Sequence, residues 1–278
     1  MRFMLTAGFC LLLSNLLTAQ YYYKDILNGK LLKEEMNLFK TSGIRNISVE
    51  SYEEDGSASK GFFCKKQLSK DYKKVETGMR SPETAPSLVI TTFNESGSIE
   101  STYDSSEISV KSINYRYDPA GRIQNISSRI KSSDEDYVTE ITESHIYSYN
   151  PSGLPEKMTL IRNGKESGDI LFAPDEQGRI SIEKETSTGK SIYYYYDEKG
   201  NLTDIVRENE RTGKMLPDYM FEYDDNKRLV KMLNTEDGSS NYLVWLYFYD
   251  AKGLKTSEKI YSKERKLIGR LEYSYKLR

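Results

Sequence analysis

A short turn signature recurs along the last two thirds of this 278-residue chain. Its fullest form is Tyr-x-Tyr-Asp-x-x-Gly, and successive copies lie 22 to 32 residues apart. Asp can bond its own backbone, Pro presets φ and Gly accepts a positive φ, so each copy is typical of a tight turn. A period of this length predicts tandem units of one β-hairpin each. The copies occupy residues 91–97, 115–121, 147–153, 172–178, 194–200, 221–227 and 247–253, and residues 273–275 begin an eighth.

Large β-forming residues alternate with polar residues before each turn. Tyr115 and Tyr117 flank Arg116, for example, and Phe221 and Tyr223 flank Glu222. A period of two indicates strands with one aromatic face and one wet face. We therefore predict an all-β fold in which tandem hairpins form a curled or spiral antiparallel sheet around the tyrosines. Curling is expected because about sixteen strands exceed what a twisted open sheet usually carries.

The first nineteen residues have the character of a secretory signal peptide. Arg2 precedes an apolar run from Phe9 to Leu17, and Ala19 offers a small residue for cleavage before Gln20. We expect a secreted, periplasmic or cell-surface protein that has no membrane span once the signal is removed. Cleavage would leave Cys64 as the only cysteine, so we expect a buried, unpaired thiol and no intramolecular disulfide.

Residues 20–87 are less regular than the rest and are predicted to form an N-terminal capping region. A short helix is favoured over residues 24–40, although Asn28-Gly29 is also a hairpin signal. Residues 44–52 and 61–68 resemble a degenerate hairpin, and residues 77–87 resemble a linker or long loop. The repeat array is expected over residues 88–278, because terminal units of repeat proteins usually differ from internal ones.

The motif at residues 115–123 and 194–202 resembles the YD-repeat proteins of the Rhs and teneurin type. The resemblance covers residues 91–278, and the closest match is to short secreted forms from Bacteroidetes-like bacteria. It implies β-sheet shells at or outside the cell surface, which some family members link to carbohydrate binding or to encapsulating a toxin. This chain departs from the pattern where Pro174 replaces the second tyrosine and Lys227 replaces glycine. No toxin domain follows the repeats, so encapsulation is not expected.

Charge and residue content exclude several function classes. Lys and Arg total 40 against 42 acidic residues, and the two signs are interspersed, so no basic stripe indicates nucleic acid or an anionic membrane as a partner. A single histidine, His145, cannot build a histidine-based metal cluster, and no Gly-x-Ser-x-Gly elbow accompanies it. Turn geometry already explains the repeated aspartates without calcium. No cofactor, metal or catalytic residue is therefore predicted.

Aromatic residues interrupt the face that is otherwise polar. In other copies that face carries residues such as Arg116 and Glu222. Two interpretations stand: the N-terminal segment covers these aromatics, or they form an exposed platform for sugar rings or a partner protein. The candidate ligand-binding residues are Tyr193, Tyr195, Tyr242 and Phe248.

The sequence therefore predicts a secreted repeat protein that presents a binding surface for a glycan or a cell-envelope protein, without catalysis. Two alternatives stay open. A carboxylate-based hydrolase of envelope polysaccharide needs only two facing carboxylates, and 42 acidic residues are present. An outer-membrane barrel also uses about sixteen alternating strands, although the charged wet face argues against it.

Overall fold

The computed structural model describes residues 21–82, 84–133, 139–209, 212–235 and 241–277, so the predicted signal peptide lies outside the described residues. The described residues form one helix, α1 (Lys24–Thr41), and eighteen strands. The strands are β1 (Ile44–Glu53), β2 (Phe63–Leu68), β3 (Lys74–Arg80), β4 (Ser87–Phe93), β5 (Ile99–Ser105), β6 (Ser109–Tyr117), β7 (Ile123–Ser132), β8 (Glu140–Tyr149), β9 (Pro155–Arg162), β10 (Lys165–Pro174), β11 (Ile180–Glu185), β12 (Ser191–Tyr196), β13 (Leu202–Glu208), β14 (Met215–Tyr223), β15 (Leu229–Thr235), β16 (Tyr242–Tyr249), β17 (Lys255–Ser262) and β18 (Leu267–Leu277).

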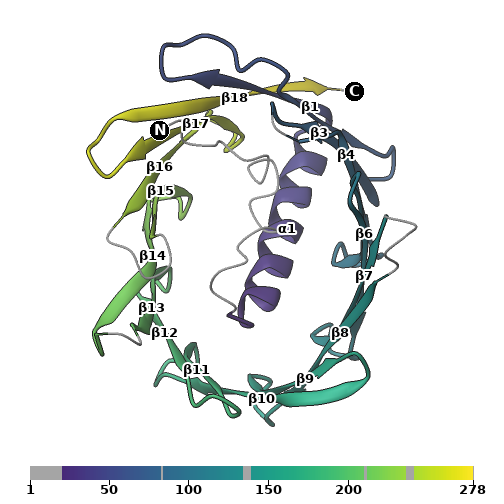
Figure 1. The fold of residues 1–278 in the computed structure, drawn as a ribbon, viewed down its shortest axis with the longest axis vertical. Helices are drawn as coiled ribbons and strands as arrows, with labels where there is room; N and C mark the ends of the chain where they lie inside the picture. Colours follow the sequence, from purple (N-terminus) through teal and green to yellow (C-terminus); the bar gives the residue numbers. More distant parts are fainter. Residues whose placement is uncertain (1–20, 83, 134–138, 210–211, 236–240, 278) are drawn as a thin grey trace.

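The sheet closes on itself into a barrel. Each strand pairs antiparallel with its neighbours in the sequence, and β1 also pairs with β18, from Ile44 opposite Leu277 to Glu53 opposite Gly269 (Figure 1). The prediction of an all-β antiparallel sheet of hairpins is confirmed. The sheet is a closed ring instead of a spiral, because β1 gives β18 a partner where an open sheet would leave an edge.

The N-terminal region is part of the same wall. β3 pairs with β4 directly across the expected boundary at residues 87 and 88. The prediction of a linker over residues 77–87 is wrong for residues 77–80, which belong to β3, and for Ser87, which begins β4; all of them are paired. The helix α1 covers the range where the sequence favours a helix.

Each complete hairpin of the repeat array carries a bulge beside its turn. In the hairpin of β6 and β7 the register shifts between Arg116 and Tyr117, and that of β14 and β15 shifts between Glu222 and Tyr223. A bulge bends its strand and increases the local twist. Repetition of this feature around the sheet favours the curvature that a closed barrel needs. Equivalent shifts occur at Thr92/Phe93, Ser148/Tyr149, Ala173/Pro174, Tyr195/Tyr196 and Phe248/Tyr249.

The second tyrosine of the signature links each hairpin to the preceding one. The Tyr149 hydroxyl donates to the Ile123 carbonyl at 2.6 Å, and the Tyr249 hydroxyl donates to the Leu229 carbonyl at 2.7 Å. Each acceptor lies two residues after the glycine position of the previous turn. The copy with Pro174 has no hydroxyl to donate, and in another copy Lys227 takes the glycine position with φ of 62°. The same bond occurs at Tyr117, Tyr196, Tyr223 and Tyr275.

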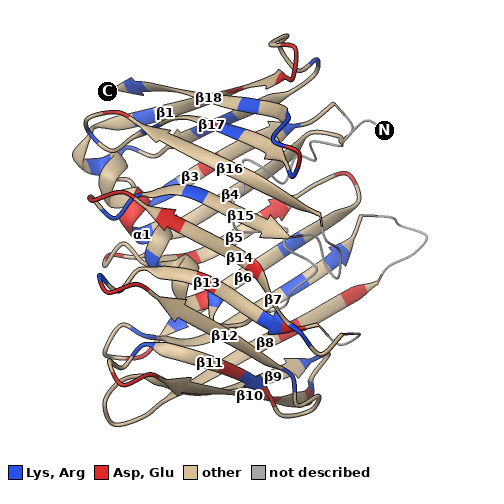
Figure 2. Cartoon of the chain, turned by 90° about the vertical axis from the view of Figure 1, so that its left-hand side faces the viewer, with Lys and Arg blue, Asp and Glu red and all other residues tan. Residues whose placement is uncertain are grey.

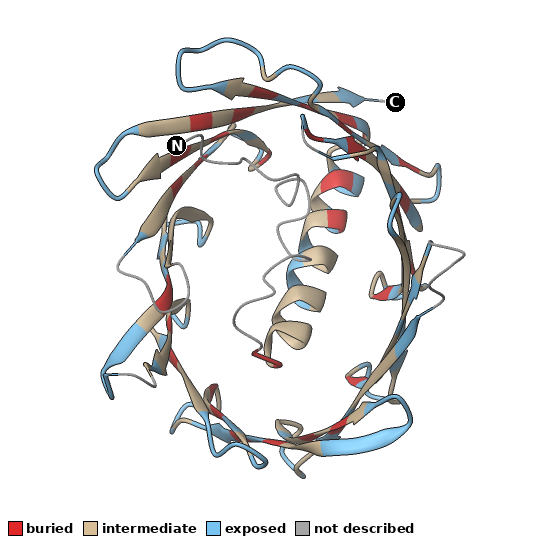
Figure 3. Cartoon of the chain, in the orientation of Figure 1, coloured by how far each residue is buried: buried red, intermediate tan, exposed pale blue. Residues whose placement is uncertain are grey.

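The aromatic face of the strands points into the barrel, as predicted. Tyr147, Tyr194 and Tyr219 are buried there, whereas Arg116 and Ser148 are exposed on the outer wall (Figure 3). The inward side chains form a large cluster along β7 to β14 and a second one along β1 to β5. Burial of these rings supplies the main driving force for folding.

Helix α1 lies inside the ring of strands (Figure 1). Its C-terminal half packs through Met36 and Phe39 into the cluster along β1 to β5, and Ile26 packs at its N-terminal end into the cluster along β7 to β14. Leu31 of α1 is 54% exposed. None of the described helical residues form a segment long and apolar enough to cross a membrane.

Cys64 is buried in the core, as predicted, but it is disulfide-bonded in this structure. The expectation of an unpaired thiol applied to a chain cleaved after Ala19, whereas this structure is that of the whole chain. The other cysteine of the sequence, Cys10, lies outside the described residues.

Candidate functional site

The four candidate ligand-binding residues lie on the outer wall. Tyr193 and Tyr195 alternate along β12 with the buried Tyr194, and Tyr242 and Phe248 alternate along β16 with buried residues such as Tyr247. The structure places α1 in the lumen and β1 to β3 in the wall, so the described N-terminal elements, from α1 to β3, do not cover these aromatics. Tyr195 is 50% exposed and Phe248 is 41% exposed, whereas Tyr193 and Tyr242 are half-buried.

The four residues do not converge on a single point. Strands β13, β14 and β15 separate β12 from β16, which places the two pairs about 19 Å apart at ~4.8 Å per strand spacing. Tyr195 is instead the first member of a longer row of paired residues, most of which are apolar.

One row of paired outward residues runs from β12 to β18, and we call it the outer belt. Its polar member is Asp204, opposite Tyr195. At ~4.8 Å per strand the row is about 29 Å long. Sequence reasoning missed its aliphatic members, because the alternation within one strand does not show which residues of neighbouring, bulged strands lie opposite one another. The outer belt consists of Tyr195, Asp204, Met220, Leu233, Val244, Tyr261 and Leu267, each paired with the next.

Charged residues flank the outer belt on the neighbouring row. Lys231 pairs with Glu222 at 2.6 Å, and the Lys259 ammonium lies 5.3 Å from the centre of the Phe248 ring. Strand β16, which is part of this wall, contains no charged residue (Figure 2). The outer belt therefore combines an apolar centre with a charged margin.

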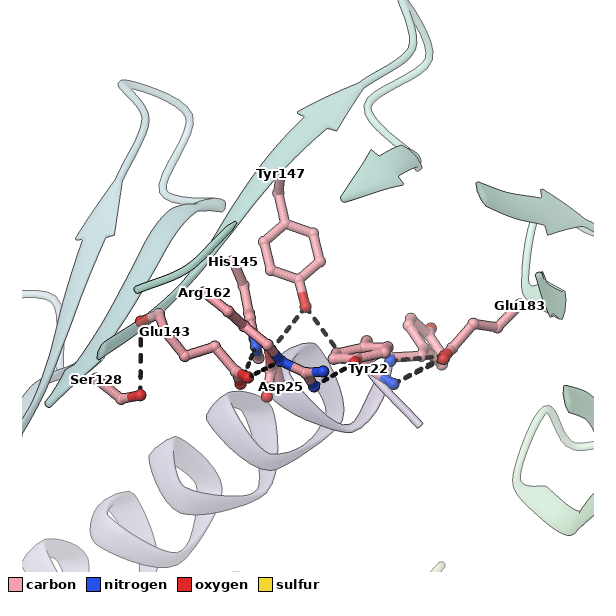
Figure 4. Close-up of polar contacts among 9 residues, drawn as sticks. Tyr22, Asp25, Ser128, Glu143, His145, Tyr147, Arg162 and Glu183 are labelled. Atoms are coloured by element: carbon pink, nitrogen blue, oxygen red, sulfur yellow. Dashed lines mark hydrogen bonds and ion pairs between the residues drawn. The ribbon is translucent and has the colours of Figure 1, made fainter. Parts of the chain in front are cut away.

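A second cluster lies in the lumen, where the first turn of α1 meets the barrel wall (Figure 4). Both ring nitrogens of His145 contact carboxylates: Nδ1 lies 2.6 Å from Asp25 of α1, and Nε2 lies 2.8 Å from Glu143 of β8. The Arg162 Nε donates to the other oxygen of Glu143 at 2.8 Å. The Tyr147 hydroxyl lies 2.9 Å from Asp25. We call Asp25, Glu143, His145 and Arg162 the lumenal anchor.

Glu183 of β11 holds the start of the helix. Its carboxylate accepts hydrogen bonds from the backbone N–H groups of Tyr22 and Tyr23 and from the Tyr194 hydroxyl, at 2.7 to 3.0 Å. The N-cap residue of α1 makes no side-chain capping bond of its own. Glu183 therefore supplies from the wall the acceptor and negative charge that favour a helix N-terminus.

Burial and hydrogen bonds shift the pKa values of two residues of the lumenal anchor and of Glu183 beside it. Burial acts to lower the pKa of His145, but its hydrogen bonds to Asp25 and Glu143 outweigh burial and raise that pKa to about 9. The hydrogen bond from His145, together with that from Arg162, overcomes burial and lowers the pKa of Glu143 to about 2. Burial raises the pKa of Glu183, against the backbone hydrogen bonds that lower it. At neutral pH the histidine is therefore a cation between two carboxylates.

The geometry of the lumenal anchor stabilises the docked helix. Its side chains contact one another and so join Asp25 of α1 to β8 and β9, and the His145 side chain is only 13% exposed. Acid–base chemistry would require a substrate to reach this histidine. Over the described ranges, no group of three or more His, Cys, Asp or Glu side chains is arranged to hold a metal ion.

Comparisons with known proteins leave the family of this chain open. No family model matches, and no curated protein matches. The TcdB2-TccC3-TEV crystal structure is similar over 73% of this chain, with 15% identity and a TM-score of 0.34, and this chain spans 11% of its length. A porin-like protein from Bacteroides uniformis is similar over 84% of this chain and 98% of its own, with 8% identity and a TM-score of 0.38. At these values neither likeness establishes kinship.

Proposed function

We propose that this chain is an exported, non-catalytic protein of the YD-repeat type that binds a partner protein through its outer belt. The single observation that carries the proposal is the belt itself, a row on the outside of a closed barrel that is apolar without interruption from Met220 to Leu267. An isolated exposed apolar residue is normal on a protein surface, whereas a contiguous patch indicates an interaction site.

The composition of the outer belt favours a protein over a glycan. Protein interfaces are enriched in Tyr, Phe and Met at an apolar centre with a polar margin. The middle of the belt is aliphatic, formed by Met220, Leu233 and Val244. A sugar platform would instead need aromatic rings at its centre, and the middle of the belt has none.

The closed barrel suits this function because it holds the belt rigidly. Every described strand is paired on both sides, so the wall has no free edge that could bind by strand addition. Binding through the wall must therefore use side chains instead of strand addition. The lumenal anchor and α1 contribute by stabilising the wall from within.

The test compares two outward positions that are exposed to a similar degree. A photoreactive phenylalanine derivative is placed at Tyr195 in the outer belt or at Tyr103 on β5, which is 41% exposed on another part of the wall. Each protein is irradiated with an extract of the cell envelope and with the unlabelled protein as competitor. We expect one competable adduct with a protein from Tyr195 and none from Tyr103.

Binding to a glycan array run in parallel separates the two partner classes. Saturable glycan binding that is lost in the Tyr195→Ser/Met220→Ser variant, without any protein adduct, would replace the protein partner by a sugar. Equal adducts from both positions, or adducts that the Tyr195→Ser/Met220→Ser competitor still displaces, would contradict a role of the belt.

A further inference from the structure

A notch of about 280 Å³ opens on the rim of the barrel that carries the repeat turns. It lies between the turn after β12 and the turn after β14, with the ring of Tyr223 in its lining. The remaining lining residues are Asp197, Glu198, Lys199, Asn201 and Asp224. The position is independent of the outer belt and of the proposed function.

Three other copies of the repeat show what occupies the equivalent place. In each, an arginine follows the glycine position and its Nε donates at 2.7 Å to the aspartate that begins the turn. The guanidinium carbon lies 4.4 to 5.1 Å from the centre of the next repeat's second tyrosine ring. The three sets are Asp118, Arg122 and Tyr149; Asp175, Arg179 and Tyr196; and Asp224, Arg228 and Tyr249.

The same guanidinium also reaches the next turn. Arg179 Nη1 lies 3.3 Å from the Asp197 carbonyl oxygen, and Arg228 Nη1 lies 3.3 Å from the Asp250 carbonyl oxygen. Arg179 and Arg228 thus each bond a carboxylate, stack on a ring and contact a carbonyl. Planar guanidinium groups are suited to this combination, because they donate in a fixed fork and stack on aromatic faces.

At the notch the arginine is replaced by Asn201. The Asn201 Nδ2 donates to Asp197 at 2.8 Å, but its short side chain leaves the space beside the Tyr223 ring open. In the described part of the chain, no Lys or Arg cation lies over that ring. Asp197, Tyr223 and the Asp224 carbonyl therefore repeat the arrangement around Arg179 and Arg228 without its guanidinium.

The other copies do not offer an equivalent site. Leu254 follows the glycine of the Asp250 turn and is buried, and Leu154 precedes the copy in which Pro174 takes the tyrosine position. In the turn at residues 94–97, Asn94 provides no carboxylate. Among the complete copies, the turn at Asp197 is the one with a carboxylate, a short following residue and a tyrosine.

Charge around the notch favours a cation. The two turns carry four acidic residues, Asp197, Glu198, Asp224 and Asp225, against three basic ones, Lys199, Lys227 and Arg228. The side-chain hydrogen bond from Asn201 lowers the pKa of Asp197, which keeps this carboxylate ionised at neutral pH. A carboxylate oxygen can accept more than one hydrogen bond, so the bond from Asn201 leaves room for a second donor.

We propose that this notch binds the guanidinium of an arginine side chain from a partner protein or peptide. The guanidinium stacks on Tyr223, pairs with Asp197 and takes the place that Arg122, Arg179 and Arg228 fill in their own repeats. Lysine is a weaker ligand there, because a point charge cannot form the fork and the stack together.

The test is a titration of the whole protein followed by backbone amide NMR. The ligand is N-acetyl-arginine amide, and the matched control is N-acetyl-citrulline amide, which has nearly the same shape without the charge. We expect saturable shifts centred on Gly200 and Asn226, with binding at least tenfold weaker for the citrulline ligand and several-fold weaker for N-acetyl-lysine amide.

Two variants of one residue give opposite expectations. Asn201→Arg fills the notch from within and abolishes binding, whereas Asn201→Ser keeps the notch open and retains it. Should Asn201→Arg fail to fold, Tyr223→Leu removes the stacking ring and gives the same loss. The proposal would be overturned by equal binding of the citrulline ligand, by binding that persists in Tyr223→Leu or Asn201→Arg, or by the absence of shifts at these turns.

Discussion

The fold requires His145 to be protonated, because the ring makes a hydrogen bond on each side. Because Nδ1 and Nε2 each contact a carboxylate, both nitrogens must donate, and only the protonated ring can do so. One of these carboxylates belongs to α1 and the other to β8. Protonation of a single side chain therefore links the helix to the wall.

The stability of the protein should fall as the pH rises from 6.5 to 9. The pKa of His145 is about 9 in the folded protein and 6.5 in the unfolded chain, so its contribution is complete below pH 6.5 and is lost as the pH rises through 9. The loss in the free energy of unfolding is at most about 3 kcal/mol. Urea unfolding at pH 6.5 and 9 measures it, with His145→Gln as the comparison.

The comparison with His145→Gln isolates this effect, because the chain has one histidine. We expect the variant to be less stable at pH 6.5 and to show a much smaller change between the two pH values. The same pH dependence between pH 6.5 and 9 in both proteins would exclude His145 as its source.

Glu143 acts in the acidic range. Its pKa is about 2 in the folded protein and 4.5 in the unfolded chain, so its contribution to stability is lost as the pH falls from 4.5 to 2.

At the scale of the element, the hairpins are coupled through their tyrosines. The hydroxyl of the second tyrosine donates to a carbonyl of the preceding hairpin, as that of Tyr249 does to Leu229, so the residue matters more for this contact than for its own turn. Neighbouring repeats in such arrays stabilise one another through their shared interfaces. This explains why a phenol occupies a position where a phenyl ring would also fill the space.

Removing one phenol should weaken one such interface. Tyr249→Phe leaves the Leu229 carbonyl without this donor, and we expect the free energy of unfolding to fall by about 1 kcal/mol. Tyr242→Phe on the same strand is the control, because that side chain faces outward and has no such bond to an earlier hairpin. Chemical denaturation measures both, and equal effects would contradict the inter-repeat role.

At the scale of the whole molecule, closure depends on two strands from opposite ends of the chain. Ser48 of β1 lies opposite Ser274 of β18, 226 residues away in the sequence. Contacts over such a separation carry a large loop-closure cost, and folding is expected to be slow. Once formed, the pairing removes both edges of the sheet and so protects the barrel from edge-to-edge association.

A disulfide across this seam tests closure directly. Paired antiparallel residues have Cα atoms about 4.5 to 5.5 Å apart, within the range that a disulfide spans. Ser48→Cys/Ser274→Cys should therefore form an intramolecular bond on oxidation and gain up to about 5 kcal/mol of stability. Electrophoresis under non-reducing conditions detects the bond, and unfolding measures the gain.

The control places the second cysteine elsewhere on the wall. Ser48→Cys/Ser144→Cys joins β1 to β8, which lie apart in the strand order, and no bond within the monomer is expected. An open spiral sheet would give no bond in either pair, and that result would contradict the closed barrel.

The sequence by itself determines the features that local chemistry fixes. The turns follow from residues such as Asp118 and Gly121, and the buried face follows from alternation, as at Tyr194 and Tyr195, because both effects act within a few residues. The outward position of the four candidate aromatics could be predicted for the same reason. Their exposure could not, since it depends on where α1 lies.

Only the tertiary structure decided closure, the place of the helix and the make-up of the two sites. Pairing of β1 with β18 joins segments that no local pattern relates. The outer belt aligns Met220 with Leu233 and Val244 only after bulges have shifted the register, and Asn201 opens a notch only because the next repeat supplies Tyr223. Such features arise between repeats, where the energy comes from packing and pairing across the sheet instead of from the preference of any one segment.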